Sequence, residues 1–220
     1  MEGVIFIDKP KGMTSFDVVK KTRQRLRIRK VGHCGTLDPL ATGLLVVLLG
    51  KSTKLFNAFS AFDKAYEATM ELGVRTTTGD CQGDIIERRK AEGIRQEDVE
   101  RVFEEFKGTT SQLPPMFSAL KYKGRKLYEF ARRGIEVPRK ERLVTIETLS
   151  LTRFHLPYVD FYLRCSKGTY VRSLAQDVGE RLGCGACIVE IRRVGIGPIT
   201  ISEAISLDQL NESHIRHWPS

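Results

Sequence analysis

The chain has 220 residues, of which 41% are hydrophobic and 29% are charged, so it can form a folded core and is not composed like a disordered protein. Its 36 basic and 27 acidic residues give a net charge of +9, which favours a polyanionic partner such as nucleic acid. The longest apolar run, residues 44–49, is far shorter than the roughly 20 residues of a membrane helix. The first residues lack the basic start and long apolar stretch of a signal peptide, so we expect a cytoplasmic protein without a membrane partner.

The first half of the chain predicts two strands and two helices before a third strand. Proline and glycine end the first strand, and Thr14 or Ser15 can cap the helix that follows. The apolar patterns place strands at residues 3–8, 43–49 and 64–74, and helices at 16–27 and 52–62.

The second half continues with more strands than helices. A polar glycine loop, RTTTGDCQGD, precedes a short strand in DIIERR, and the tail allows one short helix. Apolar periodicity predicts helices at residues 95–107 and 170–182, and strands at 142–154, 159–166 and 186–194. Because several strands are neighbours in sequence, we expect an α+β fold with a mixed, mostly antiparallel sheet flanked by helices. Without repeats or linkers, one domain over residues 1–220 is the simplest organisation.

Five cysteines are scattered along the chain, and two of them form CGAC at Cys184 and Cys187. A redox pair or a zinc site is one interpretation of this spacing. A zinc site needs two further ligands, and the sequence has neither a second CxxC nor an HxxxH. We therefore favour buried thiols and predict no metal.

The segment VGHCGTLDPLATGLLVV, residues 31–47, holds a single acid, Asp38, next to Pro39. The proline keeps Asp38 extended, and the glycines allow tight turns and close approach of a ligand. Such an acid can be a covalent nucleophile. It can equally form a turn by hydrogen bonding to its own backbone, and the segment alone favours the turn.

A second segment, SKGTYVRSLAQD, opens a helix with Arg172 in its first turns. An arginine beside a buried aspartate would keep that acid ionised. The alternative is a surface arginine on an amphipathic helix.

Together these segments resemble the bacterial TruB family of tRNA pseudouridine synthases. The resemblance rests on four motifs that occur in the family's order over nearly the whole chain: IDKPKGMTS, GHCGTLDPLATGLLVV, KAYEATMELGVRTTTGDCQGD and CSKGTYVRSLAQDVGERLGCGA. It implies the pseudouridine synthase fold and an isomerase that acts at uridine 55 in the TΨC arm of tRNA.

The resemblance also implies roles for single residues. Asp38 corresponds to the catalytic aspartate, Tyr66 to the tyrosine that stacks on the target uracil, and Arg172 to the arginine that pairs with the aspartate. Lys11 corresponds to a lysine that supports the first motif, and His33 to the histidine that fills the space of the flipped base. Ile191 stands where the family usually has a leucine in the pocket.

The implied reaction moves a base from nitrogen to carbon linkage and requires no cofactor and no metal. An enzyme that reworks a base must first take it out of the stack, and basic segments suit recognition of RNA by its shape and backbone.

A basic, aromatic segment at about residues 112–142 resembles the family's bacterial insertion over the TΨC arm. It includes Lys121, Lys123, Arg125 and Lys126, which could bind phosphates, although it could also be a solvated basic helix. The insertion argues for an enzyme that acts without guide RNA, and we expect a monomer.

The position at which the sequence ends bears on RNA binding, and two other functions remain open. The sequence ends at Ser220, before the small PUA domain of many family members, so we expect weaker and more salt-sensitive RNA binding. The main alternative to the isomerase is an RNA-binding protein that keeps the fold but does not catalyse the reaction. The third interpretation is a thiol or zinc protein built on the CGAC motif.

Overall fold

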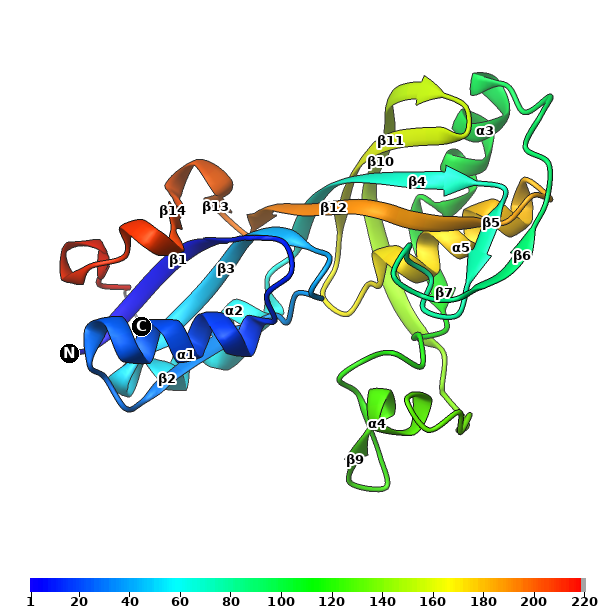
Figure 1. Cartoon of the computed structure of the whole chain (residues 1–220). Coiled ribbons are helices and arrows are strands. Elements are labelled where there is room, and N and C mark those ends of the chain that lie inside the picture. The colour runs from blue at the N-terminus through cyan, green and yellow to red at the C-terminus, as the bar shows by residue number, and fades with distance from the viewer. Residues whose placement is uncertain (219–220) are drawn as a thin grey trace. The chain divides into compact units, whose positions relative to one another are not determined.

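The computed structural model describes residues 1–218, and Ser220 at the chain end lies outside them. The chain forms two compact units: unit 1 comprises Met1–Tyr66 with Ile191–Ser220, and unit 2 comprises Glu67–Glu190 (Figure 1). Strands β4, Lys64–Leu72, and β12, Ala186–Ile196, each run from one unit into the other. A single catalytic domain over residues 1–220 stays a prediction.

Unit 1 is a small sheet whose central strand is β3, Thr42–Leu49. Strands β1, Gly3–Lys9, and β2, Val31–Cys34, pair antiparallel to it, while β12 pairs parallel to it at Thr42 and Gly43. The remaining elements of this unit are α1 Ser15–Leu26, a 3-10 turn η1 Gly50–Leu55, α2 Phe56–Ala61, β13 Ile199–Thr200, η2 Ile201–Glu203, β14 Ile205–Ser206, η3 Leu207–Gln209 and η4 Glu212–His214.

Residues 4–7 of β1 and 44–49 of β3 are all apolar because both faces of the sheet are covered. Side chains alternate along a strand, so Ile5, Ile7, Leu45 and Val47 face one core with α1. The next residues in each strand face a second core that includes Phe59 of α2. The strands at both β1 and β3 were predicted correctly, as was α1, whose N-cap is Thr14 in a capping box.

Unit 2 contains an antiparallel arrangement in which β4, β11, β10 and β7 follow one another. Helix α3 packs on it with Val99, Val102 and Phe103, and the ring of Phe103 lies 5.8 Å from that of Phe161. The elements are β5 Val74–Thr76, β6 Ile85–Arg88, α3 Gln96–Phe106, β7 Gly108–Gln112, β8 Lys121–Tyr122, β9 Arg125–Lys126, α4 Leu127–Ala131, β10 Arg142–His155, β11 Tyr158–Cys165 and α5 Val171–Arg181.

The predicted fold class, a mixed and mostly antiparallel sheet flanked by helices, is confirmed, whereas several element assignments were wrong. Strands β2 and β7 were missed because both are short and contain glycine or polar residues instead of an apolar run. The predicted helix at 52–62 is half 3-10 turn, and the tail forms 3-10 turns in place of one helix. Within residues 1–218, no helix is long and apolar enough to cross a membrane.

Candidate functional site

Asp38 lies in an irregular loop between β2 and β3 that is fixed from several sides. The Ser15 hydroxyl accepts a hydrogen bond from the Leu37 amide at 2.8 Å and donates one to the Leu37 carbonyl at 3.2 Å. The Gly12 amide donates to the Pro39 carbonyl at 2.8 Å, and the Ala41 amide donates to the carbonyl of Asp38. The half-buried aspartate is therefore held by the start of α1 and by the turn after β1.

The last residue of β1, Lys9, is a buried lysine near this loop. The ammonium group of Lys9 donates to the carbonyls of Met13 at 2.6 Å and Pro10 at 3.0 Å, and the side chain is fully buried. Burial lowers the pKa of Lys9 to about 8, and the negative charge of Asp38 partly offsets that effect. Lys11, the residue named from the sequence, is exposed in the turn.

Arg193 ties the same loop to Tyr66, and its guanidinium is almost completely buried. It donates to the Leu44 carbonyl at 2.8 Å and to the Gly35 carbonyl at 3.0 Å, and it hydrogen-bonds to the Tyr66 side chain. Burial lowers the pKa of Arg193, and Tyr66 acts in the opposite direction. This arginine connects the start of the Asp38 loop and strand β3 with Tyr66, which the family resemblance places in the active site.

A close backbone approach brings Arg193 into this position. Gly43 has a φ of +98°, and a Cβ there would lie 2.3 Å from the Arg193 carbonyl oxygen. Only glycine lets β3 and β12 approach so closely at this point. The sequence showed an EIRRVG motif and a glycine in ATGLL, but no pattern in either segment indicates that the second arginine points inward.

Unit 1 therefore contains Asp38, Tyr66, Lys11, His33 and Ile191 of the predicted site residues. His33 lies on β2, and Ile191 on β12 packs at the margin of the α1 core. Arg172 and the basic insertion belong to unit 2.

Arg172 is buried in the first turn of α5 and holds together the loop that follows β5. It donates to the carbonyls of Thr78 at 2.6 Å and Phe117 at 2.8 Å, and its Nε lies 3.7 Å from a carboxylate oxygen of Asp80. Asp80 is itself oriented, because its carboxylate accepts from the Thr78 hydroxyl at 2.6 Å and the Gln82 amide at 3.1 Å. The alternative of a surface arginine is wrong.

The buried Asp80 was missed by sequence reasoning. Its only signal is an acid next to glycine in the polar loop RTTTGDCQGD, a composition that is usual for a solvated loop.

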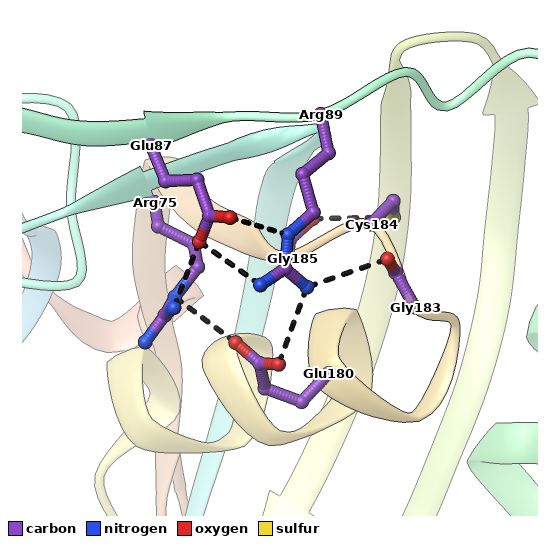
Figure 2. A network of polar contacts seen from close by, with 7 residues as sticks. All are labelled: Arg75, Glu87, Arg89, Glu180, Gly183, Cys184 and Gly185. Atoms are coloured by element: carbon purple, nitrogen blue, oxygen red, sulfur yellow. Dashed lines mark hydrogen bonds and ion pairs between the residues drawn. The ribbon is translucent and has the colours of Figure 1, made fainter.

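The hairpin that carries this loop is fastened to α5 by a network of ion pairs (Figure 2). Glu87 pairs with Arg75 at 2.9 Å and with Arg89 at 2.7 Å, and Glu180 of α5 pairs with the same two arginines. Arg89 also donates to the Gly183 carbonyl beyond the helix. Because all four side chains are about a third to a half exposed, this network orients the hairpin with a modest effect on stability.

The basic segment forms a hairpin of β8 and β9 followed by α4, between β7 and β10 (Figure 1). Lys123 and Gly124 have positive φ at the turn, and Lys121, Lys123, Arg125 and Lys126 are all exposed. The Lys123 ammonium lies 5.5 Å from the centre of the Tyr122 ring. The sequence analysis offered a solvated basic helix as the alternative for this segment and did not predict the hairpin; the helix present, α4, spans only Leu127–Ala131.

The CGAC cysteines are buried, and burial raises the pKa of Cys187 to about 12. A thiol with such a pKa is a poor nucleophile at neutral pH. No group of three or more His, Cys, Asp or Glu side chains in residues 1–218 could hold a metal ion.

Comparison with known proteins identifies the same family as the four sequence motifs. The model of the TruB family pseudouridylate synthase N-terminal domain matches residues 23–171, and that of the tRNA pseudouridylate synthase B C-terminal domain matches 172–217. The chain is 48% identical to "tRNA pseudouridine synthase B" of Burkholderia pseudomallei (strain 668) over 211 residues, which cover 96% of this chain and 70% of the relative. It is 45% identical to the protein of the same name from Photobacterium profundum, covering 96% and 66%.

Among solved structures, the chain is similar to one in a Cbf5-Nop10-Gar1 complex, with a TM-score of 0.74 and 32% identity. That match covers 94% of this chain and 53% of the other, so the chain spans about half the length of that relative. The expected fold and the resemblance are confirmed, and the chain belongs to the TruB family of pseudouridylate synthases.

Proposed function

We propose that this protein converts uridine to pseudouridine at position 55, in the TΨC arm of tRNA. The names of its curated relatives support tRNA as the substrate. The observation that carries the proposal is the arrangement in unit 1, where the Asp38 loop is tied to Ser15, to the turn of Lys9 and, through Arg193, to Tyr66. A covalent catalyst needs its nucleophile held in one geometry before the substrate arrives.

In the proposed reaction the Asp38 carboxylate is the nucleophile, attacking either the sugar or the base. The bond between the ribose C1′ and N1 of uracil breaks, the base turns, and C1′ bonds to C5. The bond that Asp38 formed to the sugar or to the base breaks again before the product leaves, so the free carboxylate is restored. C5 then loses its proton and N1 gains one, so product and substrate are isomers. No electrons or groups are exchanged with another molecule, and we therefore propose that the enzyme works without a cofactor.

The remaining roles in this proposal come from the family resemblance. Tyr66 holds the extruded uracil and takes part in proton transfer, and Arg172 is the third catalytic residue. An extruded base leaves a gap in the RNA stack, which His33 fills, and Ile191 lines the pocket. Lys11 supports the first motif.

RNA binding is assigned to exposed cations. Lys121, Lys123, Arg125 and Lys126 lie on a hairpin beside Tyr122, and cations interleaved with an aromatic ring suit phosphates and stacked bases. We further propose that the protein acts on its substrate without a guide RNA, as a monomer in the cytoplasm.

The test is pseudouridine formation on an unmodified tRNA transcript, with no metal or nucleotide added, by the natural protein and by Asp38→Asn. We expect product at uridine 55 only with the natural protein, while the variant binds the transcript within about tenfold of the natural affinity, or roughly 1.4 kcal/mol. Turnover by Asp38→Asn would refute the nucleophile assignment. Tight binding without product by the natural protein would favour an RNA-binding protein without this chemistry.

A further inference from the structure

Helix α1 and its C-cap, Arg27, carry one row of basic and aromatic side chains, in which Arg23 is half-buried and the others are exposed. Phe16, Lys20, Arg23 and Arg27 are spaced at i, i+4, i+7 and i+11, which places them on one side of the helix. An adjacent face of the helix, which includes Val18, Val19 and Leu26, is buried in the core of unit 1. Phe16 is 61% exposed.

The position of Arg23 shows where this row lies in unit 1. Its guanidinium donates to the Val31 carbonyl of β2 at 2.9 Å and lies 6.0 Å from the centre of the Phe16 ring. The row therefore borders β2. After Arg27, which ends the helix with a φ of 52°, the chain turns back into β2 through the exposed Arg29 and Lys30.

We call Phe16, Lys20, Arg23, Arg27, Arg29 and Lys30 the α1 track. Within residues 1–218, the side chains of Lys20, Arg27, Arg29 and Lys30 form no ion pair and no hydrogen bond. Asp17, the acid of this helix, already accepts hydrogen bonds from the amide and hydroxyl of Thr14. Lys20 lies close enough to Asp17 for their charges to attract, but cations outnumber acids along the α1 track. A polyanion laid along the track would reduce the repulsion among these cations.

One end of the α1 track reaches the loop of the proposed nucleophile. Ser15, the neighbour of Phe16, exchanges two hydrogen bonds with Leu37, the residue before Asp38. From Phe16 to Arg27 the helix rises about 17 Å, at about 1.5 Å per residue. A strand with a nucleotide at Asp38 would thus have several nucleotides within reach of these cations.

We propose that the α1 track binds the RNA strand that continues from the target uridine, with phosphates on the cations and one base stacked on Phe16. The inference rests on the proposed function and extends it to a second RNA-binding surface besides the basic hairpin. An exposed aromatic ring in a row of cations suits RNA because every base has a face that can stack, whatever the sequence.

The test measures binding of a fluorescein-labelled T-arm hairpin by anisotropy at several salt concentrations. In the triple variant Lys20→Gln, Arg27→Gln, Arg29→Gln, we expect affinity to fall at least about tenfold at about 0.1 M salt, and the slope of log K against log salt to become shallower by about 2. Phe16→Ala should weaken binding about fivefold with little change in slope, because stacking carries no charge. All the replaced side chains are exposed, and the thermal midpoint of each variant checks that it folds.

The matched control is Lys90→Gln, Arg95→Gln, Arg101→Gln in unit 2, which removes the same formal charge from exposed side chains that already pair with acids. It should change affinity less than about twofold. Equal losses in the two triple variants would mean that only net charge matters and would overturn the inference. Wild-type affinity in the α1 triple variant would overturn it as well. If the natural protein neither binds nor converts the hairpin, the proposed function fails. If the natural protein converts the hairpin and the α1 variants bind it as tightly as the natural protein does, the proposed function stands and only the inference about the α1 track fails.

Discussion

Lys9 makes the stability of this protein depend on pH in a way that one substitution can isolate. Its ammonium group is fully buried, and burial lowers its pKa from 10.5 to about 8. In the unfolded chain the lysine recovers its ordinary pKa, so between about pH 8 and 10.5 the unfolded state binds more protons than the folded state. Stability contributed by this group therefore rises with pH across that window.

The size of the effect follows from the pKa difference. At roughly 1.4 kcal/mol per pH unit, the buried charge lowers the free energy of unfolding by about 3 kcal/mol below pH 8. Part of this penalty remains at about pH 9.5, so the change between about pH 7 and about pH 9.5 is about 2 kcal/mol. Other groups also make stability depend on pH in this range. Burial raises the pKa of Cys34 from 9.0 to about 12, so its thiol ionises in this range only in the unfolded chain.

Comparison with Lys9→Met removes those other contributions. The methionine leaves the Met13 and Pro10 carbonyls without their donor, at a cost of about 1–3 kcal/mol each, but that cost does not depend on pH. We expect urea unfolding to show the natural protein gaining about 2 kcal/mol relative to the variant when the pH rises from about 7 to about 9.5. A difference that stays constant within about 0.5 kcal/mol would refute a buried, charged Lys9 with a lowered pKa.

Three other substitutions test the site and its support. Arg172→Lys should lower stability by about 2 kcal/mol and strongly impair turnover, since lysine cannot bond to the Thr78 carbonyl while also serving the other partners of the guanidinium; a wild-type urea midpoint and rate would contradict this. Arg193→Lys should lower the free energy of unfolding by about 1–3 kcal/mol, because the Gly35 or the Leu44 carbonyl loses its buried donor. Chemical denaturation measures this loss, and an unchanged midpoint would show that stability does not need both hydrogen bonds of the guanidinium. Glu180→Gln should cost only about 0.5–1 kcal/mol, and less in high salt, since its ion pairs are half exposed; a loss above about 3 kcal/mol would mean that the network does more than orient the hairpin.

The sequence by itself determined the elements with strong periodicity and the local chemistry of the Asp38 loop. The apolar runs at β1 and β3 and the amphipathic pattern of α1 predict their own structure, because burial of alternating or helical faces dominates over local detail. The motif around Asp38 restricts its backbone locally, so a constrained acid could be predicted without knowing its neighbours.

Only the tertiary structure decided which charged side chains are buried. Lys9 and Lys11 are equally lysines in one short motif, yet the first is enclosed and the second is exposed. Asp80 and Arg193 likewise acquire their partners from segments about 90 and 150 residues away. Sequence periodicity reports which face of an element is apolar. A buried charge also needs carbonyls or opposite charges to compensate it. For Lys9 the carbonyls are local, but its burial depends on the packed core, and the partners of Asp80 and Arg193 come together only in the folded chain.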